Sequence, residues 1–180
     1  PEPPVLERFG VDVLPLTRTP TGLDPVNPAW RPWTLPDGSP ALVPSGFDPV
    51  QNKRGDWLFD EGQVTFRMPA GGLYFDPVSH PLAEANTIAE IEAFDLPDIS
   101  SEELACLRRE AHRLHETTDK TIIGEFGGNI SEAAQILRGW ERFMMDMALE
   151  PKLAQALTQK LANYWVANLS RYLDAVGEYV

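Results

Sequence analysis

The sequence predicts an α/β fold in which strands of a parallel sheet alternate with helices. Its first part, residues 1–82, holds most of the 17 prolines and several short β-rich runs, whereas residues 83–180 show mainly helical patterns. A short apolar run at residues 120–126 lies between two predicted helices, as expected for a buried parallel strand. A strand, a helix, a second strand and further helices in succession are typical of βα units.

The chain begins with the end of a helix and a strand. Residues 6–9 precede Gly10, which suits the left-handed position after a helix. The β-rich run at residues 11–16 predicts the first strand. A proline-rich loop then extends to Trp30, so residues 1–32 are interpreted as this strand and its loop.

Residues 33–76 predict an antiparallel β-meander. Asp37-Gly38 is a hairpin signal, and a second turn ends at Gly62. The expected strands are residues 33–35, 41–43, 57–59, 64–68 and 73–75.

Residues 83–180 predict βα units and long helices. Thr87 and Glu90 have capping-box spacing, and Ser100 and Glu103 repeat it at the start of a helix that extends to about Thr117. The apolar face expected for this second helix consists of Leu104, Leu107, Ala111 and Leu114.

Glycines and a proline divide the remaining helices. The strand at residues 120–126 leads through a glycine turn into a helix at 131–138, which Gly139 separates from a helix at 140–149. Pro151 suits the first position of the last helix. Because its apolar stripe needs a covering surface, we expect the isolated chain to self-associate. The stripe comprises Leu153, Leu157, Leu161, Trp165, Leu169, Leu173 and Val176.

Composition argues against several classes of partner. The net charge of −12 repels phosphate backbones, and no basic stripe offsets it, so we expect no nucleic-acid partner. We find no apolar stretch long enough for a membrane span and no secretory leader. The single cysteine, Cys106, cannot form an internal disulfide. These observations predict a cytoplasmic protein.

The turn after the strand at 120–126 is the best local candidate for binding. Ligands of parallel α/β folds bind where strands end, and the glycines Gly127 and Gly128 let a backbone approach an anion at the next helix. The alternative is that two glycines merely form a tight turn. Asp12, beside the first strand, is a candidate general acid–base group, with an ordinary loop charge as the alternative. Arg18 follows this strand and is a candidate for the same cleft.

The histidines do not predict a metal site. His112 and His115 lie three residues apart on one helix, but a structural zinc ion needs three or four protein ligands. His80 precedes Pro81 and is interpreted as a turn residue.

Three segments together resemble the uroporphyrinogen decarboxylase superfamily. They are residues 74–98, which include Asp76-Pro77 and His80-Pro81, residues 124–139 with Phe126-Gly127-Gly128-Asn129, and residues 143–177. The resemblance implies a partial (β/α)8 barrel, because the superfamily's barrel is about twice as long as this chain. Both termini of the sequence, at Pro1 and Val180, lead to the expectation of an incomplete barrel. In particular, residues 177–180 resemble the start of a strand.

The resemblance is closest to the branch that is similar to corrinoid-dependent methyltransferases. It implies a small-molecule methyl donor and a corrinoid protein as partner. It also implies zinc bound by residues outside this chain, so that the 180 residues alone would bind no cofactor. Gln135 stands where decarboxylases of the superfamily carry a tyrosine. The implied substrate-binding residues are Asp12, Arg18, Phe126, Gly127, Gly128, Asn129 and Gln135.

Two other functions remain open. One is decarboxylation of uroporphyrinogen, a tetrapyrrole substrate, and the other is a non-catalytic module that binds a protein through its meander and acidic surface. On either enzymatic reading we expect the 180 residues alone to be inactive, because ligands and arginines of the full barrel lie elsewhere.

Overall fold

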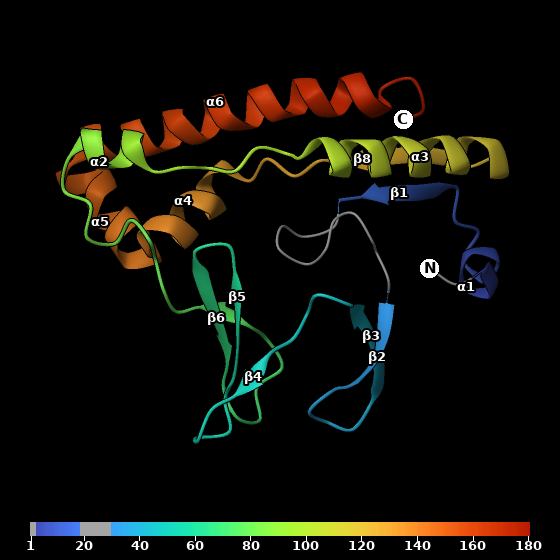
Figure 1. The fold of residues 1–180 in the computed structure, drawn as a ribbon, viewed down its shortest axis with the longest axis horizontal. Coiled ribbons are helices and arrows are strands. Elements are labelled where there is room, and N and C mark those ends of the chain that lie inside the picture. The colour runs from blue at the N-terminus through green and yellow to red at the C-terminus, as the bar shows by residue number, and fades with distance from the viewer. Residues whose placement is uncertain (1–2, 19–29) are drawn as a thin grey trace. The chain divides into compact units, whose positions relative to one another are not determined.

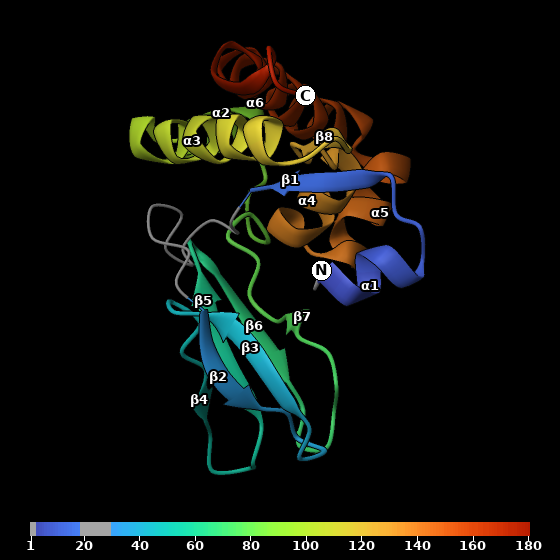
Figure 2. The same cartoon turned by 90° about the vertical axis from the view of Figure 1, so that its right-hand side faces the viewer.

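A computed structural model of the chain describes residues 3–18 and 30–180 and shows a mixed α/β structure (Figures 1 and 2). The chain divides into two compact units. The first unit comprises Pro1–Arg18, Asp98–Gly127 and Val166–Val180, and the second comprises Thr19–Pro97 and Gly128–Trp165. Within residues 3–18 and 30–180 the strands form three small sheets and no closed barrel.

A parallel pair of strands lies at the centre of the first unit. Strand β1 (Val13–Thr17) pairs with β8 (Thr121–Glu125), in a register that places Thr17 opposite Glu125. The parallel strand predicted at residues 120–126 is therefore confirmed, but its expected burial is not, because Thr121, Ile123 and Glu125 are exposed. The first strand begins two residues later than predicted.

Helices cover one face of this pair. Leu16 and Ile122 are buried in one cluster with side chains of α3 (Ser101–Thr117) and of the C-terminal part of α6 (Pro151–Val176). Figures 1 and 2 show both helices on the same side of β1. The predicted apolar face of α3 is confirmed, because Leu107 and Ala111 are buried in the same cluster. On the opposite face, Val13 is 37% and Ile123 51% exposed.

The ends of the described chain are a helix and a turn. Helix α1 (Pro3–Arg8) is followed by Gly10 with φ of 56°, as the sequence predicted. The strand expected from residues 177–180 is wrong. Gly177 donates from its backbone N–H to the Leu173 carbonyl and Tyr179 donates to the Val176 carbonyl, so the chain turns after α6.

The β-rich part of the second unit consists of two antiparallel sheets instead of one meander. Strands β2 (Trp30–Thr34) and β3 (Pro40–Pro44) form a hairpin. A second sheet has the order β4 (Val50–Gln51), β5 (Trp57–Glu61), β6 (Val64–Met68) and β7 (Asp76–Pro77). Both predicted hairpins are confirmed, whereas residues 73–75 are not a strand. The predicted proline-rich loop lies largely outside the described residues.

Aromatic side chains fill the space between these two sheets. The Phe47 ring lies 5.3 Å from Phe59 and 5.7 Å from Phe75, centroid to centroid, in edge-to-face geometry. Phe59 stacks on Phe66 across β5 and β6 at 5.1 Å. Aromatic pairs in such geometries stabilise a small sheet beyond the burial of their area.

The helical part of the second unit has a separate core. It packs α2 (Ile88–Ala93), α4 (Ile130–Arg138), α5 (Trp140–Leu149) and the N-terminal part of α6. At the junction of α4 and α5, Gly139 has φ of 86°, and a Cβ there would lie 3.2 Å from the His80 ring. The core comprises Leu82, Ala85, Ile91, Ala134, Leu137, Phe143, Leu153, Ala154, Leu157 and Leu161.

A buried ion pair joins the parts of this core. The Arg138 side chain is fully buried, and its Nε donates to Asp146 Oδ2 at 2.6 Å. Its Nη1 donates to the carbonyls of Leu82 at 2.5 Å, Ala83 at 3.1 Å and Ala85 at 2.5 Å. Arg138 therefore fixes the segment before α2 against the α4–α5 junction.

The predicted apolar stripe of α6 is only partly buried. Leu157 and Leu161 are 1% exposed, but Leu169 and Leu173 are 37% and 49% exposed. A repeat of four residues drifts by about 40° per step on a helix of 3.6 residues per turn, so such a stripe winds around it. In the C-terminal part the buried face passes to Asn168 and Tyr172, and of the predicted positions there only Val176 is buried.

Among the helices of residues 3–18 and 30–180, we find none with both the length and the apolarity to cross a membrane.

Candidate site at the carboxyl edge of β1 and β8

The parallel register of β1 and β8 brings the ends of both strands to one edge. Thr17 Oγ1 donates to Glu125 Oε2 at 2.8 Å, and Arg18 and Phe126 are the next residues on each strand. Carboxyl ends of parallel strands are where α/β proteins bind ligands. We call this cluster the carboxyl-edge site, and it comprises Thr17, Arg18, Glu103, Glu125, Phe126 and Tyr172.

Arg18 is held by an acid and an aromatic ring. Its Nε donates to Glu103 Oε1 at 2.7 Å, and the side chains are 14% and 5% exposed. Its guanidinium carbon lies 5.8 Å from the centroid of the Phe126 ring. These contacts orient a cation at the strand ends, where it can attract an anionic group.

Glu103 reaches Arg18 because it does not complete its capping box. Ser100 Oγ accepts from the Glu103 backbone N–H at 3.0 Å, as predicted. The Glu103 carboxylate pairs with Arg18 instead of returning to the Ser100 backbone. By contrast, the predicted box at α2 is complete, since Glu90 accepts from the Thr87 backbone N–H at 2.9 Å.

Tyr172, on α6, lies against Phe126 at this site. It is 1% exposed, its ring lies 5.3 Å from Phe126, and its hydroxyl has no hydrogen-bond partner among the described residues. Burial raises the pKa of this phenol, Arg18 lowers it by less, and Glu125 adds the smallest contribution, a further increase. The hydroxyl therefore remains protonated and can donate to a ligand.

A glycine makes room for this tyrosine. A Cβ at Gly124 would lie 2.6 Å from the Tyr172 hydroxyl oxygen, too close for any real side chain. Glycine within a strand often marks such a close approach. Gly124, a glycine within a predicted strand, was therefore the sequence signal that could have indicated this site.

No family model, no curated protein and no solved structure matches the chain.

The predicted substrate-binding residues do not all meet at this site. Arg18 and Phe126 do, and Gly127 follows them with φ of 98°. Asp12 is exposed and precedes β1, so it lies at the other end of the strand, where its carbonyl accepts from the Thr121 N–H. The structure thus separates Asp12 from Arg18.

The other predicted residues belong to the second unit. Gly128 has φ of 101°, and Asn129 precedes α4 without capping it, because its Nδ2 donates to Glu132 Oε2 at 2.8 Å. Gln135 is half-buried on α4, and its carbonyl accepts from the Gly139 N–H at 2.9 Å.

Glu103, Glu125 and Tyr172 were missed in the sequence analysis. Glu103 was interpreted only as part of a cap, and Tyr172 only as a neighbour of the apolar stripe of the last helix. Both interpretations are local, whereas the contacts of these residues with Arg18 and Phe126 join residues far apart in the chain.

The histidines contact aromatic rings. His112 and His115 lie 5.6 and 5.7 Å from the Tyr179 ring, centroid to centroid. Within residues 3–18 and 30–180 we find no cluster of three or more His, Cys, Asp or Glu side chains suited to a metal ion.

Proposed function

We propose that the chain is part of an enzyme of the uroporphyrinogen decarboxylase type, with a partial (β/α)8 barrel, that transfers a methyl group involving a corrinoid protein. In this proposal the carboxyl-edge site binds the small-molecule substrate. Zinc would be held by residues outside this chain, and its chemistry would be activation of an acceptor thiol.

The observation that supports this proposal best is the Tyr172 hydroxyl. A buried hydroxyl without a partner costs about 1–3 kcal/mol, which a ligand that accepts its hydrogen bond would recover. The hydroxyl belongs to a cluster that also holds a cation, Arg18, at the ends of two parallel strands. Such a combination suits a small polar or anionic substrate.

The half-covered sheet supports the barrel part of the proposal. Parallel sheets are generally buried on both faces, yet Ile123 is 51% exposed and the β1–β8 pair has two free edges among the described strands. Further strands beside β1 and β8 would bury these positions.

The test measures methyl transfer from methylcobalamin to a thiol, followed by visible absorbance, in the natural protein that contains this segment. We expect Tyr172→Phe and Arg18→Lys each to lower the rate about tenfold or more, since each removes one group from the substrate. Tyr74→Phe and Arg108→Lys are matched controls, because Tyr74 is 73% exposed and the Arg108 side chain 57% exposed. No transfer above the protein-free rate would exclude this reaction.

A second candidate is decarboxylation of a tetrapyrrole, which the Arg18 guanidinium favours because tetrapyrrole substrates carry carboxylates. The same protein is therefore incubated with uroporphyrinogen. Formation of coproporphyrinogen, together with absence of methyl transfer, would replace the first candidate with the second.

A further inference from the structure

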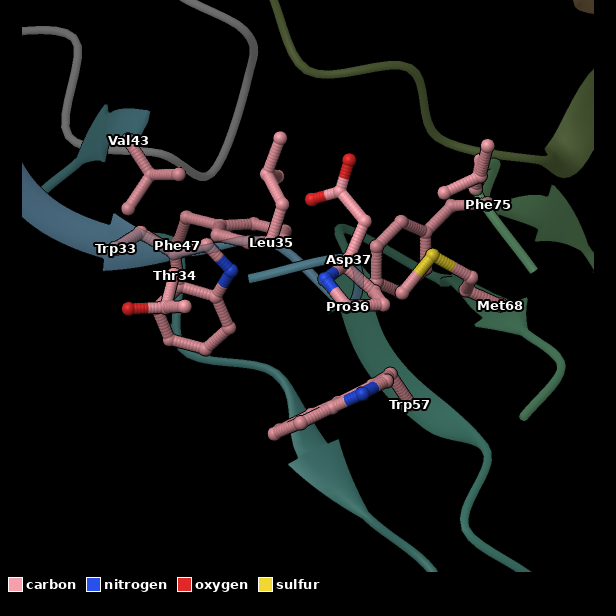
Figure 3. A pocket seen from close by; sticks show the side chains of 11 residues that line it. Trp33, Thr34, Leu35, Pro36, Asp37, Val43, Phe47, Trp57, Met68 and Phe75 are labelled. Atoms are coloured by element: carbon pink, nitrogen blue, oxygen red, sulfur yellow. The ribbon is translucent and has the colours of Figure 1, made fainter. Parts of the chain in front are cut away.

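The second unit contains an aromatic pocket that is separate from the carboxyl-edge site and shares no residue with it. The pocket has a volume of about 560 Å³, within the range of small-molecule sites. Figure 3 shows side chains of the β2–β3 hairpin, of β5 and of the segment before β7 set around it. The lining residues are Trp33, Thr34, Leu35, Pro36, Asp37, Val43, Phe47, Trp57, Met68, Leu73 and Phe75.

Two tryptophans form a corner of this pocket. The rings of Trp33 and Trp57 are 5.7 Å apart and inclined at 69°, and the Phe47 ring meets Trp33 at 5.7 Å and 72°. Rings at such angles present π-faces from more than one side. Each face carries negative electrostatic potential, and that of tryptophan attracts cations most strongly.

The charge on the lining has a single sign. Among the described residues that line the pocket, Asp37 is the one with a side chain that is charged at neutral pH. Its Oδ1 accepts from the Ser39 backbone N–H at 2.9 Å, and hydrogen bonds from Ser39 lower the pKa of the carboxyl. An anion would be repelled here, and a neutral apolar ligand would gain nothing from the carboxylate.

The chain already places a cation on one of these rings. The Arg31 guanidinium carbon lies 5.1 Å from the Trp33 centroid, and Nη2 donates to the Phe47 carbonyl at 2.5 Å. Arg31 is not among the residues that line the pocket, so its side chain does not occupy the cavity.

We propose that this pocket binds a methylated ammonium cation, such as a trimethylammonium group. A primary ammonium needs about three acceptors for its N–H groups, but within residues 3–18 and 30–180 the lining side chains offer as oxygen acceptors only Asp37 and the Thr34 hydroxyl. A trimethylammonium group has no N–H to satisfy, and its methyl groups contact aromatic rings while its charge is balanced by Asp37. This inference does not depend on the proposed methyl transfer.

The test compares choline with 3,3-dimethylbutan-1-ol, its neutral carbon analogue of the same shape. Indole N–H signals of the complete chain are followed by heteronuclear NMR during each titration. We expect choline to shift the Trp33 and Trp57 signals saturably and to bind about fivefold or more tightly than the alcohol. Equal affinity of the two compounds, or no shift with choline, would overturn the proposal.

Substitutions locate the site. Trp57→Leu should weaken choline binding about fivefold or more, and Trp57→Phe should weaken it less, since a phenyl face attracts cations less than an indole face. Trp140→Leu is the matched control, because Trp140 is 65% exposed on α5. If Trp57→Leu fails to fold, Trp57→Phe decides the result.

Asp37→Asn tests the charge while keeping an acceptor for the Ser39 N–H. It should lower choline affinity about threefold without changing the affinity for the alcohol. Asp95→Asn, an exposed substitution with the same change in net charge, should leave both affinities unchanged. Equal losses in Asp37→Asn and Asp95→Asn would show that only net charge matters and would contradict the proposed site.

Discussion

Arg138 in the second unit and Arg18 in the first are both withdrawn from water, but they are satisfied differently. Arg138 is fully buried and bonds to Asp146 and to three backbone carbonyls. Arg18 is 14% exposed, and we find one hydrogen bond for it among the described residues, from Nε to Glu103. Arg138 is therefore a structural tie that water does not reach, although its Nη2 has no partner among the described residues. Arg18 differs in its exposure, because its remaining donors lie at the edge of a sheet where a ligand can reach them.

Two glutamates with the same capping-box spacing show a parallel difference. Glu90 returns to its own N-cap at Thr87, so its hydrogen bonds are local. Glu103 leaves its cap and pairs with Arg18, 85 residues away in the chain. Identical local spacing can therefore stabilise the start of a helix in one case and supply a partner for a distant arginine in the other.

The largest expected effect is on Arg138. Arg138→Met should lower the free energy of unfolding by about 3–5 kcal/mol, because the Asp146 carboxylate stays buried without its partner. Urea unfolding followed by circular dichroism measures this loss. Arg142→Met is the control, since Arg142 is 46% exposed and lies 3.8 Å from Asp146. Equal losses of unfolding free energy in the two variants would show that the buried Arg138–Asp146 pair stabilises the protein no more than the exposed Arg142 does.

Gly124→Ala should have the next largest effect. The added methyl group would meet the Tyr172 hydroxyl oxygen at 2.6 Å, which predicts a loss of about 1–3 kcal/mol in unfolding free energy. Adding Tyr172→Phe removes the closest atom and should restore part of it. Purely additive losses in the double variant would show that the two residues do not meet.

Arg18→Gln should cost less than Arg138→Met, about 1–2 kcal/mol, because Arg18 has fewer bonds and the Gln amide can still donate a hydrogen bond to the buried Glu103 carboxylate. The same urea titration measures it, with Arg108→Gln as the exposed control. A loss as large as that of Arg138→Met would mean that Arg18 is also a structural tie.

The smallest effect concerns Glu90. Hydrogen bonds from Asn86 and Thr87 lower the pKa of its carboxyl below the ordinary 4.5. A lowered folded-state pKa stabilises the protein above the unfolded value and loses that contribution as pH falls through the folded value. Glu90→Gln should therefore reduce stability at pH 7, and the difference from the native chain should vanish in acid. A difference that stays constant across this pH range would contradict the assignment.

The sequence predicted those elements whose signals are local. The hairpin at Gly62, the cap at Thr87 and the glycine break at Gly139 all appear where expected, since turn and capping chemistry lies within a few residues. Even the parallel strand at residues 121–125 could be predicted, because a short apolar run between helices suits a buried strand.

What could not be predicted depends on distant partners. Leu169 looked like a continuation of the apolar stripe, but the buried position is Asn168, which accepts from the Ile99 N–H at 2.9 Å. In the same way, the site partners of Arg18 come from α3 and β8. Spacing along the chain carries no information about such pairings.

The pairing of β1 with β8 also has a consequence for synthesis of the protein on the ribosome. Thr17 and its partner Glu125 are separated by 108 residues, which at about 5–20 residues per second amounts to roughly 5–20 seconds of translation. Throughout that interval a nascent strand with Leu14 and Leu16 has no native neighbour. Pro15, at its centre, lacks an N–H and so weakens any premature ladder with another chain. Pro15 therefore disfavours incorrect pairing of β1 until β8 has been synthesised.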